Sequence, residues 1–205
     1  MGPFVDSGLV VAVVLAGGGG RRMGGVDKAG LVLGGRTMLD RVLSAAAGVA
    51  GRLVVVGPPR PVDLERAVIF VQEGNPGGGG PVPAVAAALD ATGGASVVLV
   101  LAVDLPLLTS ADLSRLVGDL LAADTPVGAV AAADPSGRPN PLLAAYRAEV
   151  LADFDARPGA AARDLLPADV MVVDLGPRAT LNVNTPADLE RAGAALVPDP
   201  SDGAC

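Results

Sequence analysis

The chain has 205 residues, more than half of them hydrophobic, and a formal net charge of −7. It contains no histidine and one cysteine, Cys205, so imidazole-based catalysis, internal disulfide bonds and thiolate metal clusters are excluded. The negative charge argues against nucleic acid as a partner, and no apolar run approaches the roughly 20 residues of a membrane span. Since residues 1–16 also lack a basic segment, we expect a cytoplasmic protein.

Strand-like and helix-like segments alternate along the chain. Short apolar runs predict strands at 9–15, 53–56, 68–71, 96–103, 127–132, 142–146 and 170–175. Apolar residues at helical spacing predict helices at 37–50 and 110–122, the latter with Ser110 as its cap, and further helices are predicted at 82–91, 159–165 and 186–195. The alternation predicts an α/β protein, a single-domain three-layer α/β/α sandwich with a mainly parallel sheet over residues 1–197. The polar residues 198–205 predict a disordered tail.

The run 96–103 gives the strongest strand signal, because its apolar residues are continuous rather than alternating. Continuous apolar runs are typical of central parallel strands, which are covered on both faces. In sheets of this kind ligands bind outside the carboxyl ends of the strands. Residues that directly follow a strand are therefore the candidates for a ligand site.

A glycine loop follows the first strand. Residues 17–20 are all glycine, Arg22 follows closely, and Lys28 comes six residues after it. Glycine lets backbone N–H groups approach an anion, and arginine and lysine supply full positive charge. The spacing does not fit a P-loop. It does not fit a dinucleotide fingerprint either, because the third glycine of that motif would fall on Arg22 or Met23. We interpret the segment as a polyphosphate-binding loop.

Asp104 directly follows the run 96–103. A carboxylate at this edge has the hard oxygens that suit Mg²⁺, which binds through one or two carboxylates together with substrate phosphates and waters. The residues alone leave a second interpretation open, a turn or helix-start residue, because Pro106 and Thr109 follow closely.

Two asparagines precede the last predicted helix. Asn182 and Asn184 alternate along an extended segment, so we expect their side chains to share a face and to reach a metal or phosphate. Thr185 is the expected N-cap, with Pro186 at the first helical position. We therefore assign the asparagines to the site, and Thr185 and Asp188 to the helix.

Together these motifs resemble the molybdenum cofactor guanylyltransferases. The resemblance rests on Leu-Ala-Gly-Gly at 15–18, Arg-Arg-Met-Gly-Gly-Val-Asp-Lys at 21–28, the strand–Asp–x–Pro context of Asp104, and Asn-Val-Asn-Thr-Pro-Ala-Asp-Leu at 182–189. It covers residues 11–192 and implies a Rossmann-like nucleotidyltransferase fold. It also implies Mg²⁺ as cofactor, with GTP and molybdopterin (or its molybdenum-loaded form) as substrates. GMP would be transferred to the phosphate of the acceptor, and pyrophosphate released.

The resemblance also implies roles for individual residues. It assigns catalysis to Arg22, Lys28 and Asp104, and the metal to Asp104 and Asn184. It places the nucleotide against Leu15, Ala16, Gly17, Gly18, Lys28, Glu73, Gly80, Pro81 and Asp104, and the acceptor or its phosphate against Asn140, Asn182 and Asn184. For Glu73 a solvated loop carboxylate is the competing interpretation. The chain departs from the family pattern at Pro83 and Ala84, where relatives continue Gly-Pro with Leu-Ala-Gly.

Two alternatives remain open from the sequence: a cytidylyltransferase or other nucleotidyltransferase with a different phosphorylated acceptor, and a non-catalytic nucleotide-binding homologue. Gly18 favours guanine, because the cytosine branch usually reads Leu-Ala-Ala-Gly. The joint presence of Lys28, Asp104 and Asn184 favours a catalyst. We expect a monomer or weak oligomer with transient partners in cofactor synthesis or delivery.

Overall fold

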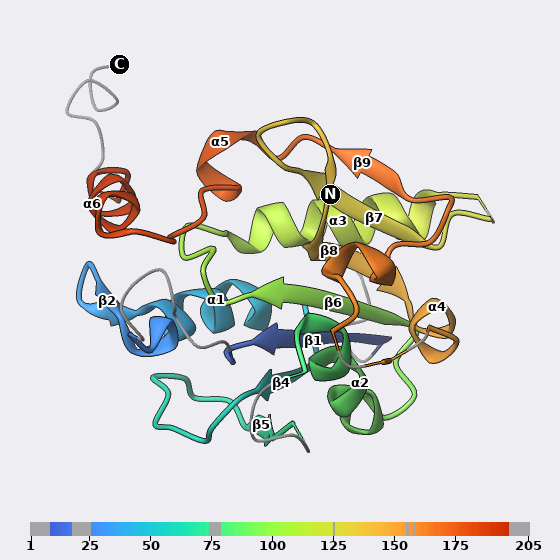
Figure 1. The fold of residues 1–205 in the computed structure, drawn as a ribbon, viewed down its shortest axis with the longest axis horizontal. Helices are drawn as coiled ribbons and strands as arrows, with labels where there is room; N and C mark the ends of the chain where they lie inside the picture. The colour runs from blue at the N-terminus through green and yellow to red at the C-terminus, as the bar shows by residue number, and fades with distance from the viewer. Residues whose placement is uncertain are drawn as a thin grey trace.

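The computed structural model describes residues 9–17, 26–73, 79–124, 126–154, 156–157 and 159–196. Its centre is a seven-stranded sheet of order β5-β4-β1-β6-β8-β7-β9 (Figure 1). The strands are β1 (Val10–Leu15), β4 (Arg52–Val56), β5 (Val68–Val71), β6 (Val97–Ala102), β7 (Ala129–Ala133), β8 (Pro139–Arg147) and β9 (Met171–Val173). Within this sheet β8 is antiparallel to both of its neighbours, and the other adjacent pairs are parallel. The prediction of a mainly parallel sheet is confirmed.

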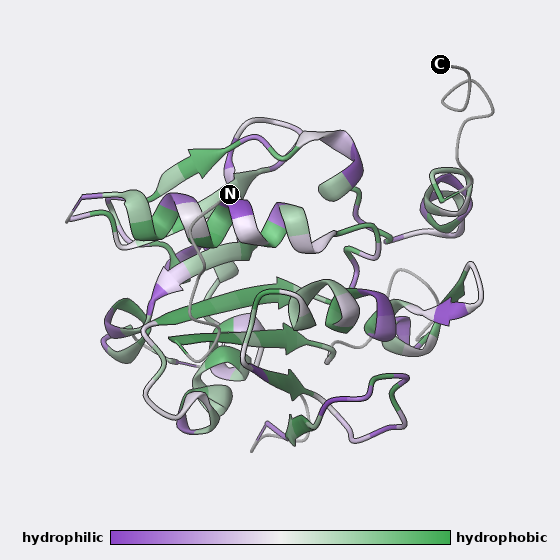
Figure 2. Ribbon diagram, turned by 180° about the vertical axis from the view of Figure 1, so that it is seen from behind, coloured by the Kyte–Doolittle hydropathy of each residue, from purple (hydrophilic) through white to green (hydrophobic). Residues whose placement is uncertain are grey.

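Helices cover both faces of the sheet, so the three-layer prediction is also confirmed. On one face lie α1 (Met38–Ala47) and α3 (Ser110–Ala122), which are seen in front in Figure 2. On the other lie α2 (Pro81–Thr92), α4 (Ala148–Ala152) and the 3₁₀ helix η4 (Ala162–Leu165). The strands between the two layers are the most hydrophobic part of the ribbon in Figure 2.

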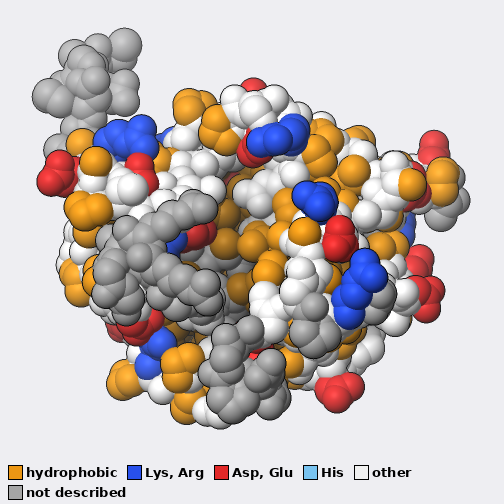
Figure 3. Space-filling view, in the orientation of Figure 1, with side chains coloured by type: hydrophobic (Ala, Val, Ile, Leu, Met, Phe, Trp, Pro, Cys, Tyr) orange, Lys and Arg blue, Asp and Glu red, His pale blue; other side chains and the backbone are white. Residues whose placement is uncertain are grey.

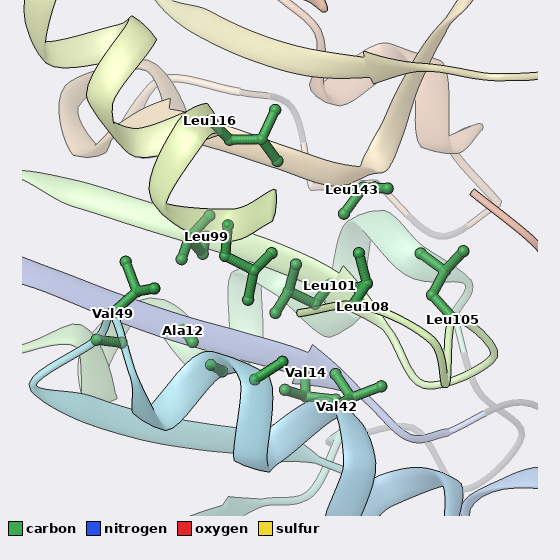
Figure 4. Close-up of a cluster of buried hydrophobic side chains, with 14 of the residues drawn as sticks. Ala12, Val14, Val42, Val49, Leu99, Leu101, Leu105, Leu108, Leu116 and Leu143 are labelled. Carbon is green, nitrogen blue, oxygen red and sulfur yellow. The ribbon is translucent and has the colours of Figure 1, made fainter. Parts of the chain in front are cut away.

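Burial on both faces explains the continuous apolar runs. In β1, Val10, Ala12 and Val14 pack with α1 and α3, whereas the alternate residues pack with α2. Figure 4 shows Leu99 and Leu101 of β6 among side chains from β1, α1 and α3. Both leucines are fully buried, and burying a leucine side chain contributes about 1.5–3 kcal/mol. The central strand therefore forms a rigid support for the residue that follows it.

The C-terminal part of the chain returns to the end of β6. After α5 (Gly176–Ala179), the segment 180–185 leads into α6 (Pro186–Ala194). The backbone N–H of Val183 donates to the carbonyl of Asp104 at 2.9 Å. Val183 is buried in a small third core cluster with Leu33, Met38, Leu107 and Ala192. This packing brings the segment of Asn182 and Asn184 to the carboxyl end of β6.

Some local predictions are corrected by the structure. The segment 159–165 forms only the 3₁₀ helix η4 instead of a longer helix, because Gly159 has a φ of 81° and few residues remain before Pro167. Helix 110–122 is confirmed, but its N-cap is Thr109. Ser110 instead donates its hydroxyl hydrogen to the carbonyl of Ala45 at 2.9 Å and so connects α3 to α1.

Short elements escaped prediction. These are the 3₁₀ helix η3 (Lys28–Gly30), the hairpin β2 (Val32–Leu33) and β3 (Arg36–Thr37), and the helices α4 and α5. Strand 142–146 is confirmed but begins earlier, at Pro139. The predicted tail 198–205 lies outside the described residues. None of the helices in the described ranges has the length and hydropathy needed to cross a bilayer.

Candidate active site

Three predicted site residues from distant parts of the chain meet at one nitrogen atom. The Nζ of Lys28 lies 3.1 Å from Oδ2 of Asp104 and 2.7 Å from Oδ1 of Asn184. The side chains of Lys28 and Asp104 are 18% and 23% exposed, so the ion pair is partly shielded yet open to a ligand. The fold therefore joins the glycine-loop motif, the strand–Asp motif and the asparagine motif.

The start of η3 presents Lys28. Oδ1 of Asp27 accepts a hydrogen bond from the N–H of Ala29 at 3.2 Å and caps this short helix. The other carboxylate oxygen of Asp27 pairs with the guanidinium of Arg60, and Ala29 is buried beneath. Sequence reasoning missed Arg60, because no pattern marks its loop. The ion pair between Asp27 and Arg60 holds the residue before Lys28 in place and so fixes the position of the Lys28 backbone.

Asp104 is held through its backbone on two sides. The preceding N–H, of Val103, donates to the carbonyl of Leu15 at 3.2 Å, and the carbonyl of Asp104 itself accepts from Val183. The residue lies just beyond the end of β6, as the sequence predicted. A carboxylate fixed at the edge of the central strand is thus directed by rigid elements rather than by a free loop.

A capping box at the start of α6 holds Asn184. Oδ2 of Asp188 accepts from the N–H groups of Asn184 at 3.0 Å and Thr185 at 2.8 Å, and the Thr185 hydroxyl accepts from the N–H of Asp188 at 3.2 Å. The hydrogen bond from Arg191, followed by those from Asn184 and Thr185, lowers the pKa of Asp188 to about 2. The assignment of Thr185 and Asp188 to the helix, with Pro186 at its first turn, is confirmed.

A second group of predicted residues lies where β1 and β5 end and α2 begins. Oε2 of Glu73 accepts from the N–H of Gly79 at 2.9 Å, and a Cβ on Gly17 would stand 3.5 Å from Oε1 of Glu73. Glu73 is therefore a half-buried residue beside Gly17 rather than a solvated carboxylate. Gly80, with a φ of 95°, caps α2 directly before Pro81. An L-residue would be strained at this φ.

Leu15 and Ala16 are both buried, and the N–H of Ala16 donates to the carbonyl of Val56 at 2.9 Å. Their side chains belong to the core, so a nucleotide would meet them through the backbone. Gly18 and Arg22 lie outside the described residues.

The structure does not bring the other predicted acceptor residues to Lys28. Oδ1 of Asn140, in β8, accepts from the N–H of Leu142 at 3.0 Å, which is a local turn contact. Asn182 is partly exposed and precedes the buried Val183. Among the described contacts, Asn184 is thus the predicted acceptor residue that joins the Lys28 ion pair.

The donor set suits a shared magnesium ion. Asp104 and Asn184 direct one carboxylate and one amide oxygen toward the same positive charge, and both are hard ligands. In the described part of the chain, no group of three or more acidic, histidine or cysteine side chains could hold a metal alone. The residues fit Mg²⁺ that is completed by substrate phosphates and water, rather than an all-protein cage.

The molecular surface offers both apolar and charged contacts. Figure 3 shows a hollow near the middle of one face, with hydrophobic side chains inside it and charged side chains at its margin. A recess of this kind can contact the flat face of a ring with its floor and charged substituents with its rim.

Sequence comparisons identify relatives of the chain. Residues 12–172 match the family model of the MobA-like NTP transferase domain. The chain is 34% identical over 200 residues to a molybdenum cofactor guanylyltransferase of Acidiphilium cryptum, which covers 89% of this chain and 93% of the relative. A molybdenum cofactor guanylyltransferase of Sinorhizobium fredii is also 34% identical, over 208 residues that cover 91% of this chain and 92% of the relative.

Solved structures share the fold. A homologue of Mycobacterium tuberculosis Rv0371c from Mycobacterium sp. strain JC1 has a TM-score of 0.71 at 21% identity, covering 94% of this chain and 98% of that one. Molybdopterin-guanine dinucleotide biosynthesis protein A of Archaeoglobus fulgidus has a TM-score of 0.64 at 22% identity, covering 91% and 98%. The predicted Rossmann-like nucleotidyltransferase fold is confirmed. With the family model spanning most of the sheet and the relatives aligned over nearly the whole chain, this protein belongs to the MobA-like NTP transferase family.

Proposed function

We propose that the protein is a cytoplasmic, Mg²⁺-dependent molybdenum cofactor guanylyltransferase. It would transfer GMP from GTP to the terminal phosphate of molybdopterin or of its molybdenum-loaded form and release pyrophosphate. The observation that carries this proposal is the meeting of Lys28, Asp104 and Asn184 at one point. The curated relatives named molybdenum cofactor guanylyltransferase, aligned over about nine tenths of both chains, support the choice of substrates.

The reaction needs little proton chemistry. An oxygen of the acceptor phosphate attacks the α-phosphorus of GTP, a new P–O bond forms, and the bond to the β-phosphate oxygen breaks. The electron pair leaves with pyrophosphate. A phosphate monoester, with a second pKa of about 6, is already ionised near neutral pH and needs no strong base. This agrees with a chain that has no histidine.

The protein residues would act by positioning and by neutralising charge. The backbone at Gly17 and the ammonium of Lys28 would hold phosphate oxygens, and the sequence motif adds Arg22 to this set. Asp104 and Asn184 would hold Mg²⁺, which supplies charge neutralisation on the triphosphate when bound. Glu73 and Gly80 would border the base or ribose, because Glu73 lies beside Gly17 and accepts from the N–H of Gly79, and Gly80 caps α2 directly after it.

The test is a nucleotide panel of GTP, CTP and ATP with molybdopterin and Mg²⁺, in which product mass and pyrophosphate release are measured. We expect a GMP adduct and one pyrophosphate per turnover. A CMP adduct as the main product would show that the enzyme is specific for cytosine and not for guanine. Nucleotide binding without pyrophosphate release would identify a non-catalytic homologue. A preference of about tenfold corresponds to only ~1.4 kcal/mol, so the product mass decides more sharply than relative affinity.

A further inference from the structure

A second positively charged region lies on the α1 and α3 face of the sheet. Arg36, the first residue of β3, and Arg41, in α1, line a cavity of about 230 Å³. The remaining lining residues are Ser44, Ala45, Pro106, Leu108, Thr109 and Ser110. Arg178 of α5 lies nearby: its Nη1 donates at 3.0 Å to the carbonyl of Leu107, which stands between two lining residues, and its charge acts on Arg41. We propose that this cavity binds the phosphate group of a small anion.

The positive charge of the three arginines is not balanced by neighbouring carboxylates. Within the described ranges, no carboxylate forms an ion pair with Arg36, Arg41 or Arg178. Burial, and then the charges of Arg36 and Arg178, lower the pKa of Arg41. In a chain of net charge −7, three arginines gathered without a counter-charge are costly unless an anion joins them.

The guanidinium groups also keep unused donors. The hydrogen bonds of Arg41 go to the backbone carbonyls of Leu33 and Gly34. Arg36 reaches the carbonyl of Asp40 at a long 3.4 Å, and its buried Nε has no partner. The carbonyls position the arginines without neutralising their charge, and a buried donor without a partner destabilises the folded state. An oxyanion in the cavity would accept the remaining N–H groups, as arginine clusters do for phosphate.

The other polar groups around the cavity modify this charge only partly. Thr109 and Ser110 lie at the N-terminus of α3, a 13-residue helix whose dipole favours an anion. Asp112 opposes this effect, since its Oδ2 accepts from the N–H of Thr109 at 2.9 Å. Asp40 is buried and bonded to Thr37 and to the N–H of Asp63. The arginines are therefore the main source of attraction.

The cavity size selects the ligand class. At roughly 30 Å³ per water, the volume equals that of about seven or eight waters, which gives room for a phosphate or a pyrophosphate, and it falls below the ~300 Å³ at which pockets for drug-sized ligands begin. Inorganic phosphate and pyrophosphate are the free anions with this chemistry. The cavity is separate from the candidate active site, because neither Lys28, Asp104 nor Asn184 lines it.

The experiment is calorimetric titration of the whole protein with inorganic phosphate and, in a second arm, pyrophosphate, at constant ionic strength with chloride as the reference anion. We expect Arg36→Gln and Arg178→Gln each to weaken binding by about tenfold or more, because each removes a charged donor. Arg163→Gln makes the same charge change at a side chain that is 83% exposed, and it should bind as wild type does. A chloride titration that equals the phosphate titration would overturn the proposal.

Two further variants separate the cavity from the active site. Ser44→Asp adds a negative charge at an exposed lining residue without disturbing the core, so binding should be lost while the melting temperature is kept. Lys28→Ala removes the phosphate that the proposed active site would hold, and it should leave the binding at the arginine cavity. If Lys28→Ala abolishes it, or if Arg36→Gln and Ser44→Asp both bind like wild type, the anion belongs elsewhere and the cavity assignment is wrong. Because pyrophosphate is also the product of the proposed guanylyl transfer, titrating Lys28→Ala beside the cavity variants separates anion bound at the active site from anion bound at the cavity.

Discussion

The two halves of the sheet contribute to the candidate site in different ways. In β5, β4, β1 and β6 all strands are parallel, so Gly17, Glu73 and Asp104 reach the same edge simply because their strands end there. In the half built from β8, β7 and β9, the strands themselves bring no group to Lys28. Its contribution, Asn184, comes instead from the connection between α5 and α6.

This difference shows two routes to one site. The parallel half places functional groups through strand direction, a property that each strand carries in its own sequence. The second half depends on the connection between α5 and α6, in which Val183 is buried and its N–H donates to the backbone carbonyl of Asp104. Substitutions in the first half should therefore remove chemistry, whereas those near this connection should change how well that chemistry is aligned.

The largest expected effect is that of Asp104→Ala. Removing the carboxylate takes away the metal ligand of the parallel half, so guanylyl transfer should fall by roughly 10³-fold or more. The fold should survive, because the side chain is 23% exposed and opens no core cavity. The measurement is the steady-state rate of product formation, compared at equal concentrations of folded protein as determined by circular dichroism.

Asp119→Ala is the matched control, because Asp119 lies on α3 with its side chain 39% exposed. It should retain wild-type rate. If Asp104→Ala changed the melting temperature but not the activity per folded molecule, Asp104 would be only a turn residue and the metal assignment would fail.

Lys28→Ala should lower turnover by about 10²-fold, since it removes a positive charge from the phosphates in a partly shielded site. Lys28 is the only lysine of the chain, so its amine can be followed chemically. Acetylation of internal amines, read by peptide mass, should modify Lys28 slowly and should be blocked further by GTP with Mg²⁺. Rapid acetylation that GTP does not alter would contradict its place against the nucleotide.

Asn184→Ala should reduce transfer by about tenfold, because it removes the amide oxygen that accepts from Lys28 at 2.7 Å. Asn182→Ala is the paired comparison and should have a smaller effect, since no contact of Asn182 with Lys28 is found among the described residues. Equal losses in both variants would show that the segment acts as a whole and not through the oxygen of Asn184. The measurement is kcat at saturating Mg²⁺, with KM for GTP.

The smallest effect concerns the helix cap that holds Asn184. The pKa of Asp188 is about 2 in the folded protein and about 3.9 in the unfolded chain. Its carboxylate therefore stabilises the folded state at pH values above the pKa of the unfolded state. That contribution should be lost as the pH falls from ~4 to ~2. Asp188→Asn should lower stability near neutral pH by about 1 kcal/mol or less and flatten this part of the pH profile. Denaturant unfolding between pH 2 and 7 tests it, and an unchanged acid limb would contradict the capping role.

Sequence reasoning was most successful where a local pattern has one structural outcome. The unbroken apolar run before Asp104 is compatible with a strand covered on both faces, and β6 is the central strand of the sheet. The Thr185, Pro186 and Asp188 spacing likewise specifies a capped helix start. The run 159–165 was misleading, because alanine-rich composition favours a helix but the segment is too short to form one.

The hairpin β2–β3 shows the limit of such patterns. Its strands have two residues each, too few for any periodicity, and the turn is set by Gly34 and Gly35, which both have positive φ. The arginine cavity is a similar case. Arg36 and Arg41 are near each other in sequence, but Arg178 joins them only because α5 packs beside the loop at Leu107.

The sequence by itself determined the order of the main strands and helices, the mainly parallel sheet and the choice of Lys28, Asp104 and Asn184 as candidates, because each of these follows from a pattern that is local in the chain. Only the tertiary structure decided that these three meet. Lys28 is 76 residues from Asp104 and 156 from Asn184, and no periodicity spans such separations. Their contact depends on the strand order of the sheet and on the burial of Val183 beside Asp104, both of which arise when the whole core packs.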